Sequence, residues 1–386
     1  MTPRSISILG ATGSIGASTL DLVRRSRDEW DVIALTANCQ AAELARLARE
    51  FGAKVAVVAD ESCLPELREA LAGTGIEAAG GTAALVEAAS RPADIVLAAI
   101  VGCAGLEPTM AAIEQGRVVA LANKEALVSA GDVMTAAVRR YGTVLLPVDS
   151  EHNAIFQCLA GNDSADVARI TLTASGGPFR DWSAERLAVA TPAEAVKHPN
   201  WDMGAKISVD SATMFNKGLE LIEAYHLFPV GLDKLRIIVH PQSVVHSMVE
   251  YRDGSTLAQL GPSDMRVPIA SALAWPRRMT TPCGPLDLAA IGELTFRAPD
   301  EERFPATRLA REAAEAGGAA PAVLNAANEI AVAAFLAGQI GFTRIAANVE
   351  NVLSAYAAPA PTCLSDVLEI DGEARARARL LTEAVT

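Results

Sequence analysis

The first 148 residues alternate short apolar segments with amphipathic ones, and this alternation constrains the fold more than any other feature of the chain. Apolar runs expected to be strands lie at 5–9, 31–36, 54–58, 94–101, 117–121 and 143–148. Helical periodicity occupies gaps such as 15–25, 41–51, 107–115 and 125–140. Strands joined by helices form parallel sheets, because a crossover must return the chain to the same edge. The sequence therefore predicts an α/β fold with a doubly wound parallel sheet over residues 1–148.

The remaining chain changes character twice more. Residues 149–275 carry most of the unusual polar clusters and predict an α+β catalytic domain. Five prolines fall within 276–305, which indicates an irregular connector. Residues 306–386 predict a C-terminal helical bundle. Its expected helices are the Ala- and Leu-rich periodic segments 306–316, 321–337, 343–355 and 364–383.

Charge and cysteine content exclude several classes of protein. The formal net charge of −13 argues against a nucleic-acid or anionic membrane surface as partner. The six cysteines have neither close pairing nor zinc-type spacing, so we expect reduced thiols in a cytoplasmic protein. The longest strongly apolar stretch, 95–106, is too short to span a bilayer.

A glycine-rich turn, GATGSIG at 10–16, follows the first expected strand and opens the first expected helix. Glycines let the backbone approach a pyrophosphate, and a helix N-terminus supplies unpaired N–H groups. This context favours a Rossmann-type dinucleotide site, and a tight turn without a ligand is the alternative. The segment after the second strand contains no acidic residue to bind a ribose 2′-hydroxyl. We therefore expect NADP rather than NAD, with Asn38 and Gln40 in place of a basic residue.

Asp149 and Glu151 directly follow the apolar run 144–148. If the strand continues through them, both side chains project to the same face. Two carboxylates that share a face repel each other unless a cation lies between them, and hard oxygen ligands suit Mg²⁺ or Mn²⁺. The alternative is a solvated turn with an Asx-type hydrogen bond. Lys124 follows strand 117–121 on the ligand-binding edge of such a sheet, or else it is an exposed helix N-terminal residue.

Three polar motifs fall within 149–275. Ser175-Gly176-Gly177 follows an expected strand and predicts a nest of N–H groups for an anion. Residues 197–206 lack apolar periodicity, and we interpret them as a mobile lid whose Trp201 covers a ligand, with a packed loop as the alternative. Asn216, Lys217 and Glu220 share a face of a helix beginning near 214, which is either a phosphate and metal wall or a solvated face. Asp210, His240 and His246 are expected to be structural.

Together these motifs closely resemble the 1-deoxy-D-xylulose 5-phosphate reductoisomerase family, over essentially the whole chain. The matching blocks are GATGSIG (10–16), LANKEALV (121–128), LPVDSEHNAIFQ (146–157), SGGPF (175–179), HPNWDMGAKISVDSATMFNKGLE (198–220), HPQSVVHSM (240–248) and LNAANEIAVAAFL (324–336). The resemblance implies NADPH-dependent reduction and metal-dependent rearrangement of 1-deoxy-D-xylulose 5-phosphate to 2-C-methyl-D-erythritol 4-phosphate in non-mevalonate isoprenoid biosynthesis. It also implies a homodimer and one divalent cation, with Co²⁺ as an alternative to Mg²⁺ or Mn²⁺.

The resemblance also implies roles for individual residues. The implied metal ligands are Asp149, Glu151 and Glu220, and the residues implied to be catalytic are these three with Lys124. The implied substrate-binding residues are Lys124, Ser150, Glu151, Ser175, His198, Ser211, Asn216, Lys217 and Glu220. The implied NADPH-binding residues are Thr12, Gly13, Ser14, Ile15, Asn123, Glu125 and Gly204, and the implied lid residues include Trp201 and Met203. His152 is expected to lie behind the metal ligands.

One departure from the family pattern concerns the cofactor. Many family members carry a basic loop after the second strand, where this chain has Asn38-Cys39-Gln40. The rival hypothesis is a semialdehyde-type NADP-dependent dehydrogenase, which shares a similar glycine-rich start. It would require a nucleophilic cysteine with a partner base, and Cys158, preceded by His152, is one candidate beside Cys103.

Overall fold

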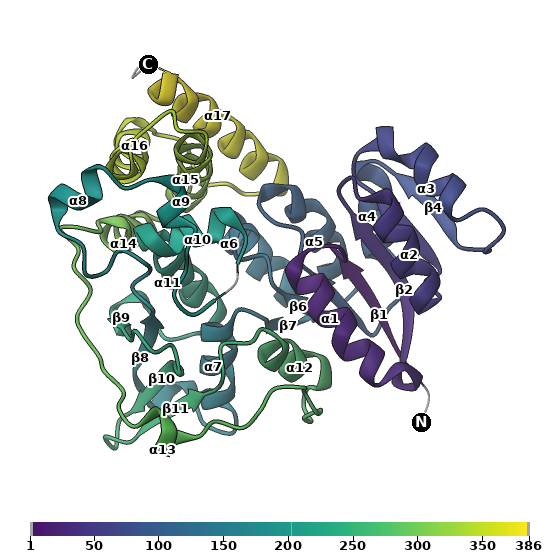
Figure 1. Cartoon of the computed structure of the whole chain (residues 1–386), viewed down its shortest axis with the longest axis horizontal. Helices are drawn as coiled ribbons and strands as arrows, with labels where there is room; N and C mark the ends of the chain where they lie inside the picture. Colours follow the sequence, from purple (N-terminus) through teal and green to yellow (C-terminus); the bar gives the residue numbers. More distant parts are fainter. Residues whose placement is uncertain (1–2, 202, 384–386) are drawn as a thin grey trace. The chain divides into compact units, whose positions relative to one another are not determined.

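The computed structural model describes residues 3–201 and 203–383. These residues form two compact units, and the chain passes between them several times, as the colours of Figure 1 show. The first unit comprises Met1–Ala126, Met134–Asn153 and Met265–Cys283. The second comprises Leu127–Val133, Ala154–Asp264 and Gly284–Thr386. This division differs from the contiguous boundaries expected at 148, 275 and 305.

The first unit is built on a seven-stranded parallel sheet in the order β4-β3-β2-β1-β5-β6-β7. Its strands are β1 (Arg4–Leu9), β2 (Trp30–Ala37), β3 (Val55–Val58), β4 (Glu77–Gly80), β5 (Ile95–Ala98), β6 (Val118–Leu121) and β7 (Val144–Pro147). The order reverses direction beside β1, so the predicted doubly wound fold is confirmed. Only β4 was not predicted, because its sequence EAAG has no β-branched or large apolar residue.

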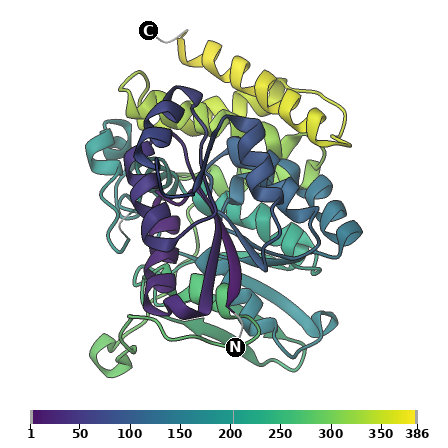
Figure 2. The ribbon, with the colours of Figure 1, turned by 90° about the vertical axis from the view of Figure 1, so that its right-hand side faces the viewer.

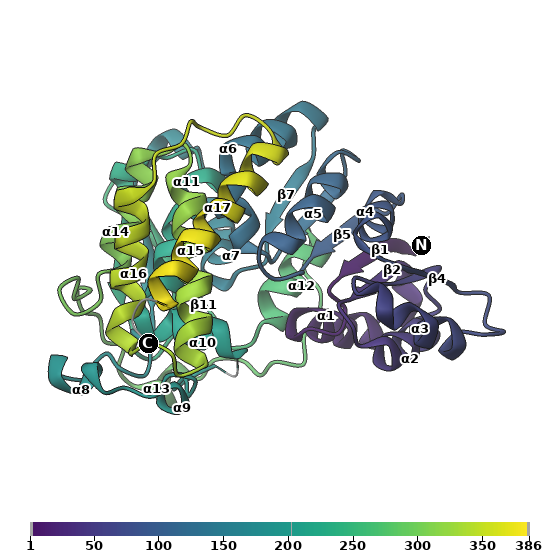
Figure 3. The ribbon, with the colours of Figure 1, turned by 90° about the horizontal axis from the view of Figure 1, so that it is seen from above.

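Helices cover both faces of this sheet (Figure 3). On one side lie α1 (Ser14–Arg25), α2 (Ala41–Phe51) and α3 (Leu64–Ala70), and on the other lie α4 (Thr82–Ser90) and α5 (Leu106–Ile113). Their apolar stripes face the strands. In α2, for example, Leu44, Leu47 and Phe51 are buried while the charged residues between them are exposed. The first sheet is thus enclosed in the way that a parallel sheet requires.

A helix distant in sequence completes the first unit. α12 (Arg266–Ala274) packs against α1, β6 and β7. Arg266 Nη1 lies 2.9 Å from Asp21 Oδ2, and Arg4 Nη1 donates to the Leu273 carbonyl over 2.5 Å. Because these contacts join residues more than 240 positions apart, no local sequence pattern predicts them.

The second unit contains a four-stranded mixed sheet in the order β11-β10-β8-β9. The strands are β8 (Val167–Ala174), β9 (Leu235–Val239), β10 (Val245–Tyr251) and β11 (Thr256–Leu260). β8 and β9 run parallel, and the other neighbours are antiparallel. Helix α11 (Phe215–Leu227) packs between this sheet and α14 (Ala306–Ala316). The predicted α+β character of this region is therefore confirmed.

The predicted C-terminal helices are also present, at one end of the second unit (Figure 1). They are α14, α15 (Ala320–Leu336), α16 (Phe342–Ala355) and α17 (Leu364–Glu383), and Figure 2 shows α17 in yellow beside the others. Their buried side chains share one core with α10 and α11. Within the expected connector, the structure has only the short helix α13 (Leu288–Ile291) and a single β-bridge between Val239 and Arg297.

The remaining elements are short, or are helices within which the chain passes from one unit to the other. They are α6 (Lys124–Tyr141), α7 (Ser150–Leu159), α8 (Ala184–Ala188), α9 (Pro192–Ala195), α10 (Ala205–Thr213) and the 3₁₀ segments at Arg27–Glu29, Glu61–Cys63, Cys103–Gly105, Ser164–Asp166 and Leu232–Lys234. α6 is kinked at Ala130, where φ is −122° and ψ is 25°. Among the described helices, none combines the length and apolarity that crossing a membrane would require.

Candidate active site

The glycine-rich turn is shaped by close backbone packing. Gly10 has φ of +90°, and a Cβ added at Gly16 would lie 2.3 Å from the Gly10 carbonyl oxygen, so neither position tolerates a side chain. α1 begins at Ser14, and its N-cap Gly13 offers no side-chain hydrogen bond. The N–H groups of the first turn are therefore available to an anion. Thr12, Gly13, Ser14 and Ile15 are all exposed or half-buried at this turn.

The loop after β2 is exposed. Asn38, Cys39 and Gln40 are exposed, and Gln40 precedes α2 without capping it through its side chain. The Asn38 carbonyl accepts a hydrogen bond from the Asp60 N–H over 3.0 Å. That bond fixes the loop backbone while the Asn38 side chain faces solvent. An uncharged pair of amides is thus what this loop can present to a ligand.

Asn123 and Lys124 lie where β6 passes into α6. Asn123 is the N-cap: its Oδ1 accepts from the Ala126 N–H over 3.1 Å, and its Nδ2 donates to the Gly102 carbonyl over 3.0 Å. Lys124 and Glu125 occupy the first turn and are only 6% and 8% exposed. The alternative of an exposed lysine at a helix N-terminus is therefore wrong. A buried ammonium requires a partner, and Asp149 in the turn after β7 supplies it.

The turn after β7 differs from the one expected. β7 ends at Pro147 and α7 begins at Ser150, so Asp149 and Glu151 do not alternate along one strand. The predicted reason for their proximity is wrong, because the chain enters a helix directly after Val148. Instead, Asp149 Oδ1 accepts from the Glu151 N–H over 3.2 Å, and the Ser150 hydroxyl donates to Glu151 Oε2 over 2.5 Å. The Asx-type bond of the alternative hypothesis is present, but the turn is not fully solvated.

Asp149 is the centre of a charged cluster within the first unit. Lys124 Nζ lies 2.5 Å from Asp149 Oδ2, and the Asp149 side chain is 12% exposed. His152 Nδ1 lies 3.3 Å from Asp149 Oδ1, and its ring is completely buried. The carboxyl ends of the neighbouring strands β6 and β7 place these groups together. This arrangement holds an oxygen-rich cluster beside one positive charge.

In the second unit, the side chains of Ser175 and His198 are in contact. The Ser175 Oγ lies 2.9 Å from His198 Nε2 and accepts from the Gly177 N–H over 3.1 Å. His198 Nδ1 accepts from the N–H groups of Asn200 and Trp201, over 3.2 and 3.0 Å. These two donors leave no room for a proton on Nδ1, so Nε2 carries the hydrogen and donates it to Ser175.

The expected lid is an irregular segment that ends at α10. Asn200 Nδ2 donates to the Pro241 carbonyl over 2.6 Å and to the Ser243 Oγ over 3.0 Å. The half-buried Trp201 ring lies 6.2 Å from the His246 ring. Met203 is half-buried and Gly204 is exposed, whereas Asp202 lies outside the described residues. The lid interpretation stays a prediction.

The helix pair α10–α11 carries the other predicted residues. Ser211 lies in the last turn of α10, and Met214, with φ of +69°, is the only residue between the two helices. Asn216 Nδ2 donates to Glu220 Oε1 over 2.6 Å, and Lys217 Nζ pairs with Glu220 Oε2. Lys217 and Glu220 are only 3% and 1% exposed, so the alternative of a solvated helix face is wrong for this pair.

One buried carboxylate in this helix was not singled out from the sequence. Glu223 is 1% exposed and follows Glu220 by three residues, so it lies one turn further along α11. That spacing was the only available signal, and it is common on solvated helices. Glu223 is notable because it is buried, and burial of this helix face depends on segments that are distant in the chain.

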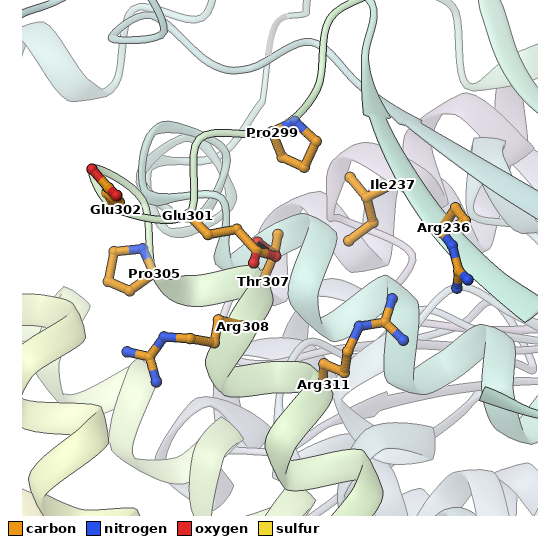
Figure 4. A pocket seen from close by; sticks show the side chains of 9 residues that line it. All are labelled: Arg236, Ile237, Pro299, Glu301, Glu302, Pro305, Thr307, Arg308 and Arg311. Atoms are coloured by element: carbon orange, nitrogen blue, oxygen red, sulfur yellow. Dashed lines mark hydrogen bonds between the residues drawn. The ribbon is translucent and has the colours of Figure 1, made fainter. Parts of the chain in front are cut away.

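One cavity of the second unit lies elsewhere, and none of the predicted site residues lines it. This cavity has a volume of about 730 Å³ and is drawn in Figure 4. Arg236 and Arg311 line it, and each donates to the Leu235 carbonyl over 2.9 Å. A smaller cavity of about 300 Å³ touches Gly176 and Met214. Neither cavity therefore identifies the site.

Cys158, the cysteine considered as a nucleophile, is in an unsuitable environment. It is 7% exposed in the core beneath β8 and β10. Burial raises the pKa of its thiol to about 11. At neutral pH only about one thiol in ten thousand would then be ionised. Cys158 is therefore a structural residue, since the thiolate is the nucleophilic form.

Comparisons with known proteins agree along the whole chain. Residues 6–131 match the family model for 1-deoxy-D-xylulose 5-phosphate reductoisomerase, 145–228 match the model for its C-terminal domain, and 260–377 match a further DXP reductoisomerase C-terminal domain. The 1-deoxy-D-xylulose 5-phosphate reductoisomerase of Zymomonas mobilis is 60% identical over 383 residues and covers 99% of each chain. That of Rhodospirillum centenum is 58% identical over 372 residues, with 96% and 92% covered.

Solved structures give the same result. The Zymomonas mobilis reductoisomerase in complex with NADPH matches with a TM-score of 0.94, 59% identity and 99% coverage of both chains. A DOX-P reductoisomerase in complex with NADPH, fosmidomycin and magnesium matches with a TM-score of 0.93, 44% identity and 98% coverage of both. This chain belongs to the 1-deoxy-D-xylulose 5-phosphate reductoisomerase family.

Proposed function

We propose that this chain performs the reaction of its family, the NADPH- and metal-dependent conversion of 1-deoxy-D-xylulose 5-phosphate to 2-C-methyl-D-erythritol 4-phosphate. The observation that carries the proposal is the buried Lys124–Asp149 pair beside Glu151, at the carboxyl ends of two neighbouring parallel strands. Open α/β sheets bind their ligands at that edge. Relatives with this fold have been solved with NADPH and with magnesium.

Asp149, Glu151 and Glu220 are the proposed ligands of one divalent cation. Their carboxylate oxygens are the hard donors that Mg²⁺ and Mn²⁺ prefer, and Co²⁺ is also compatible. The fit is supported by the turn that holds Asp149 and Glu151 together and by the burial of Glu220. When bound, the cation supplies Lewis-acid polarisation of the substrate oxygens.

Lys124, Ser150 and His152 act around these ligands. The Lys124 ammonium pairs with Asp149, and because an ammonium carries three hydrogens it is also proposed to donate to a substrate oxygen. The Ser150 hydroxyl, which donates to Glu151, can turn to a substrate hydroxyl. His152 lies against Asp149 and orients it, as residues behind metal ligands commonly do.

Ser175, Ser211, Asn216 and Lys217, together with His198, are the proposed phosphate-binding residues. The Ser175 oxygen already accepts hydrogen bonds from Gly177 and His198, so its own proton is left to donate to an acceptor. A phosphate oxygen is such an acceptor. Lys217 adds the positive charge that a phosphate monoester requires.

NADPH is the proposed cofactor, and it supplies the hydride. The uncapped N-terminus of α1 suits its pyrophosphate. The proposed contacts are Thr12, Gly13, Ser14, Ile15, Asn38, Gln40, Asn123, Glu125 and Gly204. Trp201 and Met203 are proposed to cover the bound substrate as a lid, which would exclude water during the reaction.

A homodimer is proposed as the working assembly, and the cytoplasm as its location. β11 is an edge strand of the second sheet, and its Leu257 is 44% exposed. Unprotected edges favour pairing with another chain. The free cysteines agree with a reducing compartment. Sedimentation of the protein against its Leu257→Lys variant tests the dimer, because a monomeric wild-type protein would contradict it.

The decisive experiment measures NADPH oxidation with 1-deoxy-D-xylulose 5-phosphate, with and without a chelator. Turnover should require added Mg²⁺ or Mn²⁺. Glu220→Gln should lower kcat/KM about a thousandfold at limiting metal, which corresponds to about 4 kcal/mol. Glu312→Gln, which alters only an exposed pair with Arg308, is the matched control. Metal-independent turnover, or near-normal activity of Glu220→Gln at limiting Mn²⁺, would contradict the ligand assignment.

The rival semialdehyde dehydrogenase is distinguished by thiol alkylation. That chemistry needs an ionised cysteine, and burial raises the pKa of the Cys158 thiol to about 11. We therefore expect activity to persist after treatment with iodoacetamide at pH 7. Loss of activity in proportion to alkylation of Cys158 would favour the rival.

A further inference from the structure

The sequence block LNAANE at 324–329 is polar where a helical core is normally apolar, and the proposed function leaves it without a role. It lies in α15, where Asn325 and Asn328 are completely buried. Buried amides are costly unless they are hydrogen-bonded, so their partners indicate what they do. Asn325 Nδ2 donates to the Ser129 Oγ and to Glu329 Oε1, over 3.3 and 3.1 Å. Asn328 has a different partner.

Asn328 Nδ2 donates to Asp210 Oδ1 over 2.8 Å, and Lys206 Nζ lies 2.8 Å from Asp210 Oδ2. A carboxylate can only accept hydrogen bonds, so the NH₂ group of Asn328 must face Asp210. The Asp210 side chain is 2% exposed and that of Lys206 is 26% exposed. These three side chains therefore form a continuous series of contacts from the C-terminal bundle, through the buried Asp210 carboxylate, to the first turn of α10.

The position of α10 matters to the phosphate-binding residues on both of its sides. Ser211 follows Asp210 directly in α10. The turn that carries Ser175 packs against the same helix, because a Cβ added at Gly177 would lie 2.5 Å from the Ser211 carbonyl oxygen. With Gly177 pressed against its backbone and Asn328 bonded to Asp210, α10 is clamped in place. A displacement of the helix would separate Ser211 from Ser175.

We propose that Asn328 is a positioning residue for substrate binding: through Asp210 and Lys206 it fixes α10, and with it Ser211, beside the Ser175 turn. Asn328 itself touches no substrate. The inference rests on the proposed function, because it takes Ser175 and Ser211 to be phosphate ligands. It assigns to the C-terminal bundle a part in recognising the phosphorylated end of the substrate.

The test compares Asn328→Ala with Asn348→Ala. Asn348 is the matched control, since it is 1% exposed in α16 of the same bundle and neither of its amide atoms has a hydrogen-bond partner among the described residues. We expect Asn328→Ala to raise KM for 1-deoxy-D-xylulose 5-phosphate about tenfold while KM for NADPH changes less than about twofold. Competitive inhibition by inorganic phosphate should weaken in parallel. Asn348→Ala should leave all three values unchanged.

A second variant guards against a failure to fold. Lys206→Met removes the partly exposed ammonium at the far end of this series of contacts. It should also raise KM for 1-deoxy-D-xylulose 5-phosphate. If the three side chains act as a unit, the double variant will be less impaired than the product of the two single effects. Independent effects, or Asn328→Ala kinetics equal to those of Asn348→Ala, would overturn the proposal. If the wild-type protein does not turn over this substrate at all, the proposed function fails instead.

Discussion

Among the described residues, each compact unit holds a largely buried lysine–carboxylate pair at the proposed site, Lys124–Asp149 in the first and Lys217–Glu220 in the second, and the two pairs are held in different ways. In the first unit, Lys124 meets Asp149 where two strands end, and Asp149 remains 12% exposed in a turn with backbone hydrogen bonds. In the second, Lys217 and Glu220 are neighbours on one helix and are 3% and 1% exposed. The same chemistry therefore has different energetic consequences.

The difference lies in what remains when one partner is removed. Without Lys124, Asp149 keeps His152 as a neighbour and can still be reached by water. Without Lys217, Glu220 still accepts a hydrogen bond from the Asn216 amide, but it loses its paired ammonium and stays inside the protein. An uncompensated buried charge is far more costly than one near the surface. The second pair should thus contribute to folding as well as to binding, and the first mainly to binding.

The largest expected effect tests this contrast directly. Lys217→Met should lower the free energy of unfolding by about 3–5 kcal/mol, because it removes the ammonium that pairs with the buried Glu220 carboxylate. Lys124→Met should cost only about 1–2 kcal/mol. Urea denaturation measures both. Adding Glu220→Gln to Lys217→Met should recover most of the loss, and equal losses in the two single variants would remove the contrast.

Metal binding tests whether the two units share one ligand set. At a concentration one hundred times its Kd, Mg²⁺ should stabilise the wild-type protein by about 2.7 kcal/mol. Asp149→Asn and Glu220→Gln should each abolish most of that gain, since each removes a proposed ligand. Thermal unfolding with and without Mg²⁺ is the measurement. If Glu220→Gln retains the full gain, the first unit binds the metal by itself.

Acid should weaken the second unit through His226 in α11. Burial lowers the pKa of this imidazole from 6.5, and the smaller effect of Asp132 raises it. The folded state therefore prefers the neutral ring, while the unfolded state takes up a proton near pH 6.5. Stability is complete above that pH and declines as the pH falls from about 6.5 toward the lowered folded pKa. His226→Gln should reduce the difference in unfolding free energy between pH 7.5 and pH 5.5, and an unchanged difference would exclude His226 as its source.

The smallest expected effect concerns the NADPH loop of the first unit. Asn38→Arg places a positive charge where the loop now has exposed amides. KM for NADPH should fall about fivefold, or about 1 kcal/mol, and the gain should shrink as salt is added. Steady-state kinetics at two ionic strengths provide the check. An unchanged KM would mean that the 2′-phosphate is bound elsewhere.

The sequence predicted what local patterns determine. Except for β4, the strands of the first 148 residues follow from periodicity, and Gly10 and Gly16 were recognisable because their packing is built into the turn. Asp149 and Glu151 were identified for a wrong reason, since the entry into α7 at Ser150 depends on helix formation after a very short strand. Strand alternation was expected as far as Glu151, but β7 ends at Pro147.

The features of the site that the sequence did not predict depend on contacts between residues that are distant in the chain. Helix α11, which carries Lys217 and Glu220, packs against α14 and α15, and both of those helices come much later in the chain. The bond between Asn328 and Asp210 spans 118 positions. A residue such as Asp210 resembles any other helical carboxylate until its partner is known. Sequence patterns therefore indicated the chemistry of the site better than the supports behind it.

The docking of α12 onto α1 has a consequence for synthesis of the protein on the ribosome. Domains generally fold as units while the chain is emerging, N-terminal ones first. Here the first unit includes Met265–Cys283, and Asp21 cannot form its ion pair with Arg266 until that later segment has been synthesised. The nucleotide-binding sheet thus remains incompletely covered until about half of the second unit has been translated. A ribosome that stalls midway through the message would hold a chain with an exposed apolar sheet face, which is a substrate for chaperones rather than a finished domain.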